Sequence, residues 1–329
     1  MTVRGQGRAR IDRIGGEDLE NFSVETEYIS LPHSATPRAR RTKVSWRGRP
    51  ITVLAQGEFR AYLFPVWTPQ GVAVTDESPR DHPHHNSITV GSDHVNCHFP
   101  PLLPEMTTLT EYGNYNLYVN DTFQGRTPGR VLTTSTESTE IAEDHLRVVQ
   151  SLYWQGPIEW AAPNRRNLAE ETRVIDIYPG ESSNIIDIRS KLVPTEWELS
   201  IGPTRHAYFT IRLAEGLREI DGGKSSDSEG RDGAAQISGK KADWVDGSGP
   251  GPHGKWAGIA AFKFASSGDV PWHIFDWGTI NLNPIYEDTW HLKFGGEINN
   301  GIRIVVHDGD AEEAGVADIY EASRSALLG

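Results

Sequence analysis

The stretch Phe22-Ser-Val-Glu-Thr-Glu-Tyr28 alternates between apolar and polar side chains, and Thr42-Lys-Val-Ser-Trp46 and Ile51-Thr-Val-Leu54 alternate or run apolar in the same way. A period of two is typical of a half-buried β-strand, because successive side chains of a strand point to opposite faces. Turn sequences such as Tyr178-Pro-Gly180 separate the apolar segments. Comparable patterns predict further strands within 59–67, 146–154, 172–178, 185–192, 206–213, 256–264 and 302–307.

One segment near the C-terminus has a helical pattern instead. Asp310 and Glu313 have the spacing of a helix N-cap and its partner, and Val316, Ile319 and Tyr320 follow on one face. This pattern predicts a helix over 311–325. Because no helical pattern lies between the strands, we predict an all-β fold, a large antiparallel β-sandwich with one C-terminal helix.

The domain organisation is predicted to be simple. We expect residues 1–20 to form a flexible N-terminal arm and residues 21–329 to form a single β-sandwich domain. Residues 221–255 are rich in Gly, Ser and Asp and offer little apolar surface to bury, so we expect a mobile insertion there. The alternative for this insertion is a lid over the functional site, since long loops in compact domains often serve as lids.

Composition restricts the partners and the compartment. The net charge of −13 argues against nucleic acid and anionic membranes, because both require a basic surface. The single cysteine, Cys97, excludes an internal disulfide framework. No stretch has the apolar length of a signal peptide core or a membrane span, so we expect a cytoplasmic protein. The expected partner is a small-molecule substrate, and flat sandwich edges would allow a homodimer.

Histidine placement is the most informative feature for function. Five of the twelve histidines fall between residues 82 and 98, and three of them stand in Asp81-His-Pro-His-His-Asn86. Pro83 is expected to keep the backbone extended, so that His82 and His84 point to one side and His85 to the other. Two imidazoles on one face can share a metal ion or bind and protonate a ligand. The alternative is an ordered loop in which Asp81 and Asn86 simply hydrogen-bond these rings.

Two later segments also combine histidine with polar or aromatic neighbours. Pro203-Thr-Arg-His-Ala-Tyr-Phe209 places His206 at the start of an apolar strand, where it could belong to a site or lie on the surface. Pro271-Trp-His-Ile-Phe-Asp-Trp-Gly278 surrounds His273 and Asp276 with aromatic rings. Such rings stack on sugars and shift pKa values by desolvation, although an aromatic core strand would give the same pattern.

Motifs that recur in one known family lie along most of the chain. They are Arg60–Gly71, Asp81–His85, Trp256–Ala260, Pro271–Gly278 and Val305–Gly309. In these stretches the chain resembles the family of uncharacterised proteins catalogued as methane oxygenase PmoA. The chain departs from that pattern in the residues after the histidine cluster and around Cys97, which implies an unusual substrate for the family.

A more distant resemblance concerns the segment around His206. Thr204-Arg-His-Ala-Tyr-Phe209 is similar to the Asn-His-x-Tyr-Phe segment of the galactose mutarotase-like sandwiches. The resemblance implies a supersandwich fold, with His206 as the catalytic acid and His84 or His85 as a second histidine that binds substrate. The glutamate base of those enzymes has no clean counterpart, and Asp276 lies in roughly the corresponding region. Arg205 replaces their usual asparagine.

Three functions remain open at this point. The first is an enzyme that acts on a sugar-like or small cyclic substrate by His/carboxylate proton transfer, as an epimerase, isomerase or lyase without a cofactor. The second is a metal-dependent oxygenase or hydrolase with a divalent metal bound by histidines. The third is a non-catalytic carbohydrate-binding module.

The candidate residues are divided by role. The catalytic candidates are His206, His84, His85 and Asp276; the substrate-binding candidates are Arg205, Asn86, Trp272, Trp277 and Tyr208; the metal candidates are His82, His84, His206 and His273.

Overall fold

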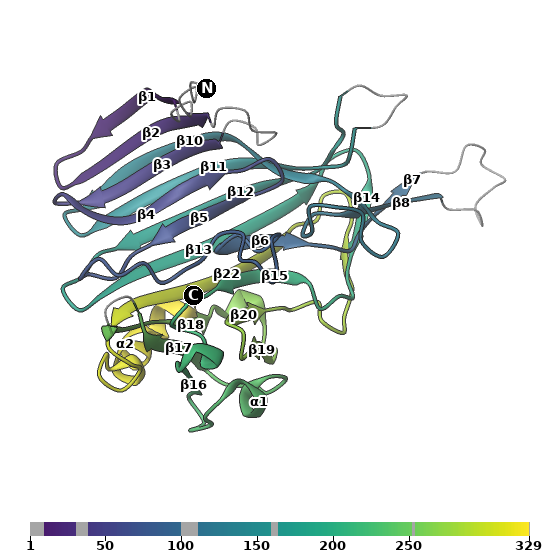
Figure 1. Ribbon diagram of the computed structural model, residues 1–329. Coiled ribbons are helices and arrows are strands. Elements are labelled where there is room, and N and C mark those ends of the chain that lie inside the picture. The colour runs from purple at the N-terminus through teal and green to yellow at the C-terminus, as the bar shows by residue number, and fades with distance from the viewer. Residues whose placement is uncertain (1–9, 31–38, 100–110, 159–163, 252–253, 329) are drawn as a thin grey trace, which may run out of the picture.

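The computed structural model describes residues 10–30, 39–99, 111–158, 164–251 and 254–328 (Figure 1). Strands dominate this part of the chain and form three sheets, in which neighbouring strands run antiparallel except for β8 and β9. The first sheet has nine strands in the order β1 (Arg10–Asp18), β2 (Phe22–Ser30), β3 (Ala39–Trp46), β4 (Arg49–Gln56), β5 (Ala61–Val66), β6 (Ile88–Ser92), β15 (Ala207–Arg212), β20 (Thr279–Leu282) and β19 (Trp272–Phe275).

The other two sheets complete the molecule. The second sheet has eight strands in the order β10 (Arg130–Ala142), β11 (His145–Gln155), β12 (Asn167–Tyr178), β13 (Ser183–Pro194), β22 (Ile298–Asp308), β18 (Trp256–Lys263), β17 (Trp244–Pro250) and β16 (Lys224–Asp227). The third has the order β21 (Trp290–Leu292), β14 (Glu198–Ile201), β7 (Val95–Phe99), β8 (Glu111–Asn116) and β9 (Thr127–Pro128). The helices are η2 (Glu219–Asp221), α1 (Ala234–Ile237), η4 (Ala265–Ser267) and α2 (Val316–Leu328).

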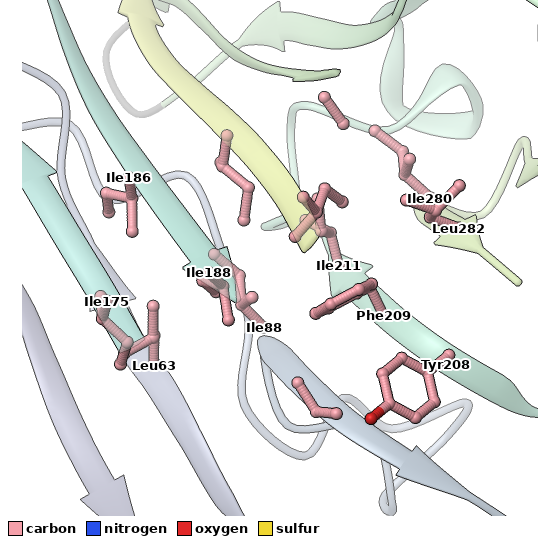
Figure 2. Packing of buried hydrophobic residues seen from close by; sticks show 14 of the residues in the cluster. Leu63, Ile88, Ile175, Ile186, Ile188, Tyr208, Phe209, Ile211, Ile280 and Leu282 are labelled. Carbon is pink, nitrogen blue, oxygen red and sulfur yellow. The ribbon is translucent and has the colours of Figure 1, made fainter. Parts of the chain in front are cut away.

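The two large sheets pack face to face around one hydrophobic core. Leu63, Ile88 and Ile211 come from the nine-stranded sheet, and Ile175 and Ile188 come from the eight-stranded sheet (Figure 2). All five side chains are buried. Burying each such side chain contributes about 1.5–3 kcal/mol, so the apolar half of every alternating segment holds the sandwich together. The predicted all-β antiparallel sandwich is confirmed.

The polar residues of the same alternating strands face away from the core. They form the surface on which the candidate site lies. In β15, Phe209 and Ile211 point into the core, so Thr210 between them points to the opposite face. β20 repeats the pattern, and Thr210 pairs directly with Asn281. Paired residues of antiparallel strands share a face. The outer face of this sheet end is therefore polar.

The C-terminal helix begins later than the sequence predicts. The expected capping box forms, since Asp310 Oδ1 accepts the backbone N–H of Glu313 at 3.1 Å and Glu313 Oε2 accepts that of Asp310 at 3.2 Å. The turn that it closes is interrupted at Gly315, whose φ of +66° is left-handed. The α-helix α2 therefore begins at Val316, and among the described residues no helix is long and apolar enough to cross a bilayer.

Two segments expected to be mobile contain strands. Strand β1 lies within the predicted N-terminal arm and pairs along its length with β2, whereas residues 1–9 lie outside the described part of the chain. Strands β16 and β17 lie within the Gly/Ser/Asp-rich segment 221–255 and extend the eight-stranded sheet. Apolar residues of this segment, including Ile237 and Val245, are fully buried. The expectation that this segment buries little apolar surface was wrong, because glycine and serine give β16 and β17 no hydrophobic pattern in the sequence.

Candidate functional site

A cavity of about 460 Å³ lies over the polar outer face of β15 and β20. Its floor is formed by Thr279 and Asn281 of β20, and Phe275 and Trp277, which precede β20, form one side. The rest of the lining comes from three segments that are far apart in sequence. These are the turn around residues 82–85, the loop after β8, and the residues just before β15. The volume is in the range of small-molecule sites.

The histidine turn forms one wall of the cavity. The backbone N–H of His85 donates to the carbonyl of His82 at 2.9 Å, which closes a β-turn with Pro83 at its second position. His82 and His85 therefore stack, with ring centroids 4.8 Å apart, and His84 meets His85 edge-on at 4.6 Å. The predicted extended backbone was wrong, since Pro83 fits a tight turn as well as a strand and all three rings line one cavity.

An ion pair between an exposed aspartate and a buried arginine fixes this turn on the sheet. Arg212 of β15 is fully buried, and its Nη2 donates to both carboxylate oxygens of Asp81 at 2.8 Å. Asp81 also accepts a hydrogen bond from His82 Nδ1 at 2.9 Å. Burial opposes ionisation of Asp81, but the hydrogen bonds from His82 and Arg212 outweigh it and hold its pKa well below the ordinary value. Trp277 stacks on His82 with centroids 4.4 Å apart and so extends the wall.

The second wall is organised around an Asp–His pair that the sequence did not reveal. His206 Nδ1 lies 3.0 Å from Oδ2 of Asp93, and the hydroxyl of Thr204 donates to the other carboxylate oxygen. Asp93 is fully buried, and Arg126 Nη1 lies 3.4 Å from Oδ2. Burial raises the pKa of Asp93, but the hydrogen bonds from His206 and Thr204 lower it by more, so the carboxyl is ionised at neutral pH.

The ionised Asp93 determines how His206 is oriented. A carboxylate only accepts hydrogen bonds, so Nδ1 of His206 carries a proton and Nε2 is the nitrogen left for a ligand. The pairing follows from the sheet, because β6 ends at Ser92 exactly opposite Ala207, where β15 begins. Asp93 could have been noticed in the sequence as a polar residue directly after the apolar strand β6. The sequence does not show, however, that β6 lies beside β15, and this is needed to pair Asp93 with His206.

Tyr118 joins the two walls. Its ring centroid lies 5.9 Å from those of His84 and His85 and 5.6 Å from that of His206. Its hydroxyl accepts a hydrogen bond from Thr210 Oγ1 at 3.2 Å, and burial raises its pKa. His84, His85 and His206 thus surround one cavity with a buried phenol between them. Sequence reasoning missed Tyr118, which lies in an irregular segment without a motif.

Burial makes two of these histidines neutral and leaves polar atoms of the cavity without partners. Burial lowers the pKa of His84 to about 4 and that of His85 further still. His85 Nδ1, Thr279 Oγ1 and Asn281 Oδ1 are buried and have no hydrogen-bond partner in the described part of the chain. Buried polar groups are normally satisfied by protein, by ordered water or by a ligand, so these three atoms mark the polar part of the cavity wall.

Two residues predicted to belong to the site, His273 and Asp276, do not line the cavity around His206. His273 faces a separate cavity of about 520 Å³ and stacks on Tyr286 with centroids 3.8 Å apart. Burial lowers its pKa. Asp276 is exposed, is not part of the lining of the histidine cavity, and its carbonyl accepts a hydrogen bond from the N–H of Ile220. Neither residue belongs to the site around His206.

The predicted substrate-binding residues divide in the same way. Arg205 and Trp277 line the histidine cavity. Trp272 and Tyr208 are fully buried in the hydrophobic core, where the Tyr208 hydroxyl bonds Ser190 at 2.8 Å, so their prediction as substrate-binding residues was wrong. Aromatic side chains serve a core as readily as a ligand, and the sequence does not distinguish the two. Asn86 lies behind the wall and accepts a hydrogen bond from Arg60 Nε at 3.2 Å.

The four histidines predicted as metal ligands do not all line the same cavity. His82, His84 and His206 share the cavity, whereas His273 lies in the other one. Within the described residues, no three side chains of His, Cys, Asp or Glu are placed to hold a metal ion together.

Comparison with known proteins identifies a family but no individual relative with a curated function. No functionally curated protein matches the sequence. One family model matches residues 41–321, which include both walls of the cavity, the whole eight-stranded sheet and the nine-stranded sheet apart from β1, β2 and the start of β3. The chain therefore belongs to the family of unknown function DUF6807.

Proposed function

We propose that this protein is an enzyme that moves a proton on a sugar-like or small cyclic hydroxylated substrate, as an epimerase, isomerase or lyase. The observation that carries the proposal is the contact of 3.0 Å between His206 Nδ1 and the buried Asp93, with His206 lining the cavity. A carboxylate behind an imidazole orients the ring and stabilises the imidazolium that forms when Nε2 takes a proton. His206 is therefore the proton carrier.

His84 has a different role from His206 in this proposal. A histidine with a pKa of about 4 is a weak base, so it stays neutral at neutral pH. A neutral imidazole can donate a hydrogen bond to an oxygen that gains negative charge when a neighbouring proton is removed. His206 Nε2 takes the proton, and the substrate oxygen accepts the hydrogen bond. The Nε2–H then gives the proton to the neighbouring carbon in an isomerisation or to the leaving group in a lyase reaction, whereas an epimerisation takes its new proton from water on the opposite face. Asp276 is not used, because it lies outside the cavity.

The aromatic walls support a sugar-like substrate. Phe275 and Trp277 stack with centroids 5.1 Å apart, and both line the cavity. Aromatic faces pack against the C–H face of a sugar ring, while the polar residues Asn281 and Thr279 line the same cavity. The resemblance of the His206 segment to the galactose mutarotase-like sandwiches supports the same assignment.

Proton exchange with solvent tests the proposal. The protein is incubated in D₂O with a panel of aldoses, ketoses and sugar acids, and deuterium incorporation and anomer or epimer interconversion are followed by NMR. His206→Ala should lower the rate by about 10²–10⁴-fold, the usual contribution of a positioned acid or base. His291→Ala, a change at an exposed histidine of β21, is the matched control. Equal rates for both variants on every active substrate would reject the assignment.

A metal-dependent oxygenase or hydrolase is the second candidate, because His82, His84 and His206 line one cavity, although a metal ion would require them to move closer together. Elemental analysis of protein purified without a histidine tag distinguishes metal-dependent catalysis from proton transfer. Near-stoichiometric iron, manganese or zinc that is lost in His206→Ala would favour this candidate. Unchanged activity after treatment with a chelator would favour proton transfer.

A further inference from the structure

The histidine cavity differs in charge from the rest of the protein. The chain carries a net charge of −13, yet the described residues that line this cavity include an arginine and four histidines and no carboxylate. The arginine is Arg205, which is exposed and forms no hydrogen bond or ion pair with any other described residue. An unpaired guanidinium at the mouth of a cavity presents a planar set of donors that matches an acid group.

A second guanidinium lies behind the histidine wall. Arg60 is only 3% exposed, and its guanidinium donates hydrogen bonds to the side-chain amide oxygens of Asn86 and Asn120. No ion pair with a described carboxylate neutralises it. Burial lowers its pKa to about 10, so it stays positive at neutral pH. A buried cation without a counter-ion is costly, and an anionic ligand nearby would reduce that cost.

The positive charge of Arg60 acts inside the cavity. It contributes, after burial, to lowering the pKa of His84, whose side chain lines the cavity. The carboxylates that contact lining residues are already engaged with cations: Asp81 with Arg212, and Asp93 with Arg126 and His206. They therefore leave the charges of Arg60 and Arg205 uncompensated.

We propose that the substrate is anionic, a sugar ring or similar polyol that bears an acid group, with Arg205 as the residue that binds this group and the ring packed on Trp277. The inference rests on the proposed function for the sugar-like part of the ligand, whereas the anion site stands on charge alone. A carboxylate and a phosphate offer the same chemistry to Arg205, and the experiment below distinguishes them.

The anion site is tested first with small probes. Acetate, inorganic phosphate and acetamide are titrated into the wild-type protein while the imidazole resonances of His84 and His206 are followed by NMR. Acetate or phosphate should shift these resonances in a saturable way that weakens at high ionic strength. Acetamide, which has the shape of acetate but no charge, should not. Equal responses to acetate and acetamide would overturn the inference, even if His206 proves to be catalytic.

The substrate class is tested with matched sugars and variants. Binding of glucuronate, glucose 6-phosphate, glucose and glucosamine is measured by calorimetry with wild-type protein, Arg205→Gln and Arg205→Lys. We expect one of the two acids to bind best, about tenfold weaker binding of that acid to Arg205→Gln, and partial recovery in Arg205→Lys. Arg324→Gln makes the same charge change on the exposed face of α2 and should leave binding unchanged.

The outcomes separate this inference from the proposed function. Tighter binding of glucose or glucosamine than of either acid would overturn the inference and leave proton transfer standing. Binding of an acid that depends on Arg205, without any His206-dependent proton exchange, would reject the proposed function and keep the anion site. If no sugar binds, the acetate and acetamide titrations still decide whether the cavity takes an anion.

Discussion

His206 and Asp93 are 113 positions apart in the sequence, yet His206 Nδ1 and Asp93 Oδ2 lie 3.0 Å apart. Strands β6 and β15 are neighbours in the nine-stranded sheet, and the two residues lie just beyond their paired ends. The contact therefore depends on strand order. It is also the contact on which the proposed chemistry depends most directly.

Replacing the carboxylate by an amide tests that dependence. Asp93→Asn keeps the size of the side chain but can donate a hydrogen bond to Nδ1, which would favour the wrong tautomer of His206. We expect turnover to fall by roughly 10²-fold or more and the acid limb of the pH–rate profile to move. Asp318→Asn, an exposed change on α2, should have no effect on either. Wild-type turnover in Asp93→Asn would show that the pair is structural only.

The low pKa of His84 predicts a pH dependence of stability. The unfolded chain has the ordinary pKa of 6.5, whereas burial lowers the folded value to about 4. The unfolded state therefore binds a proton that the folded state excludes between these values. The stability that neutral His84 contributes is fully present above pH 6.5 and is lost as the pH falls to 4.

Urea unfolding across this pH range measures the effect. The free energy of unfolding of the wild-type protein should fall more between pH 6.5 and 4 than that of His84→Gln, which has no ionisable group at this position. The carboxylates titrate in both proteins, so the difference reports His84 together with its effect on the neighbouring His85. Parallel curves for the two proteins would contradict the predicted shift.

The ion pair under the histidine turn predicts a loss of stability. Asp81→Asn leaves Arg212 buried with a neutral partner in place of a carboxylate, while its Nε and Nη1 already lack partners. Losing a charged hydrogen bond of this kind costs about 1.5–3 kcal/mol in the free energy of unfolding. Asp144→Asn, a change in the exposed turn between β10 and β11, is the control in the same urea titration. An equal midpoint for the two variants would mean that the turn does not depend on Arg212.

The aromatic residues of the cavity predict a variant that binds substrate more weakly but keeps the rate of the chemical step. Trp277→Ala removes the ring that stacks on His82, and we expect the dissociation constant of a bound sugar derivative to rise about tenfold. Trp277→Phe keeps an aromatic face and should retain most of the affinity. Calorimetry with the best ligand of the panel measures both. Equal affinity in Trp277→Ala would place the ring of the ligand elsewhere in the cavity.

The sequence predicted a large part of the fold because alternation is local. Phe22-Ser-Val-Glu25 and Phe209-Thr-Ile-Arg212 each indicate which side chains face the core and which face outward, whatever strands lie beside them. Errors arose where local signals are ambiguous. Glycine and serine concealed β16 and β17, and Pro83 fits both an extended strand and a turn.

The candidate site was predictable only in its separate pieces. The sequence by itself determined that His84, His85 and His206 stand in polar segments beside apolar strands, because residue type and spacing are properties of a few neighbouring positions. The tertiary structure decided that these segments meet around Tyr118, that Asp93 lies behind His206, and that His273 and Asp276 lie apart. Strand order and register set these relationships, and both result from packing two whole sheets together, which no short stretch of sequence encodes.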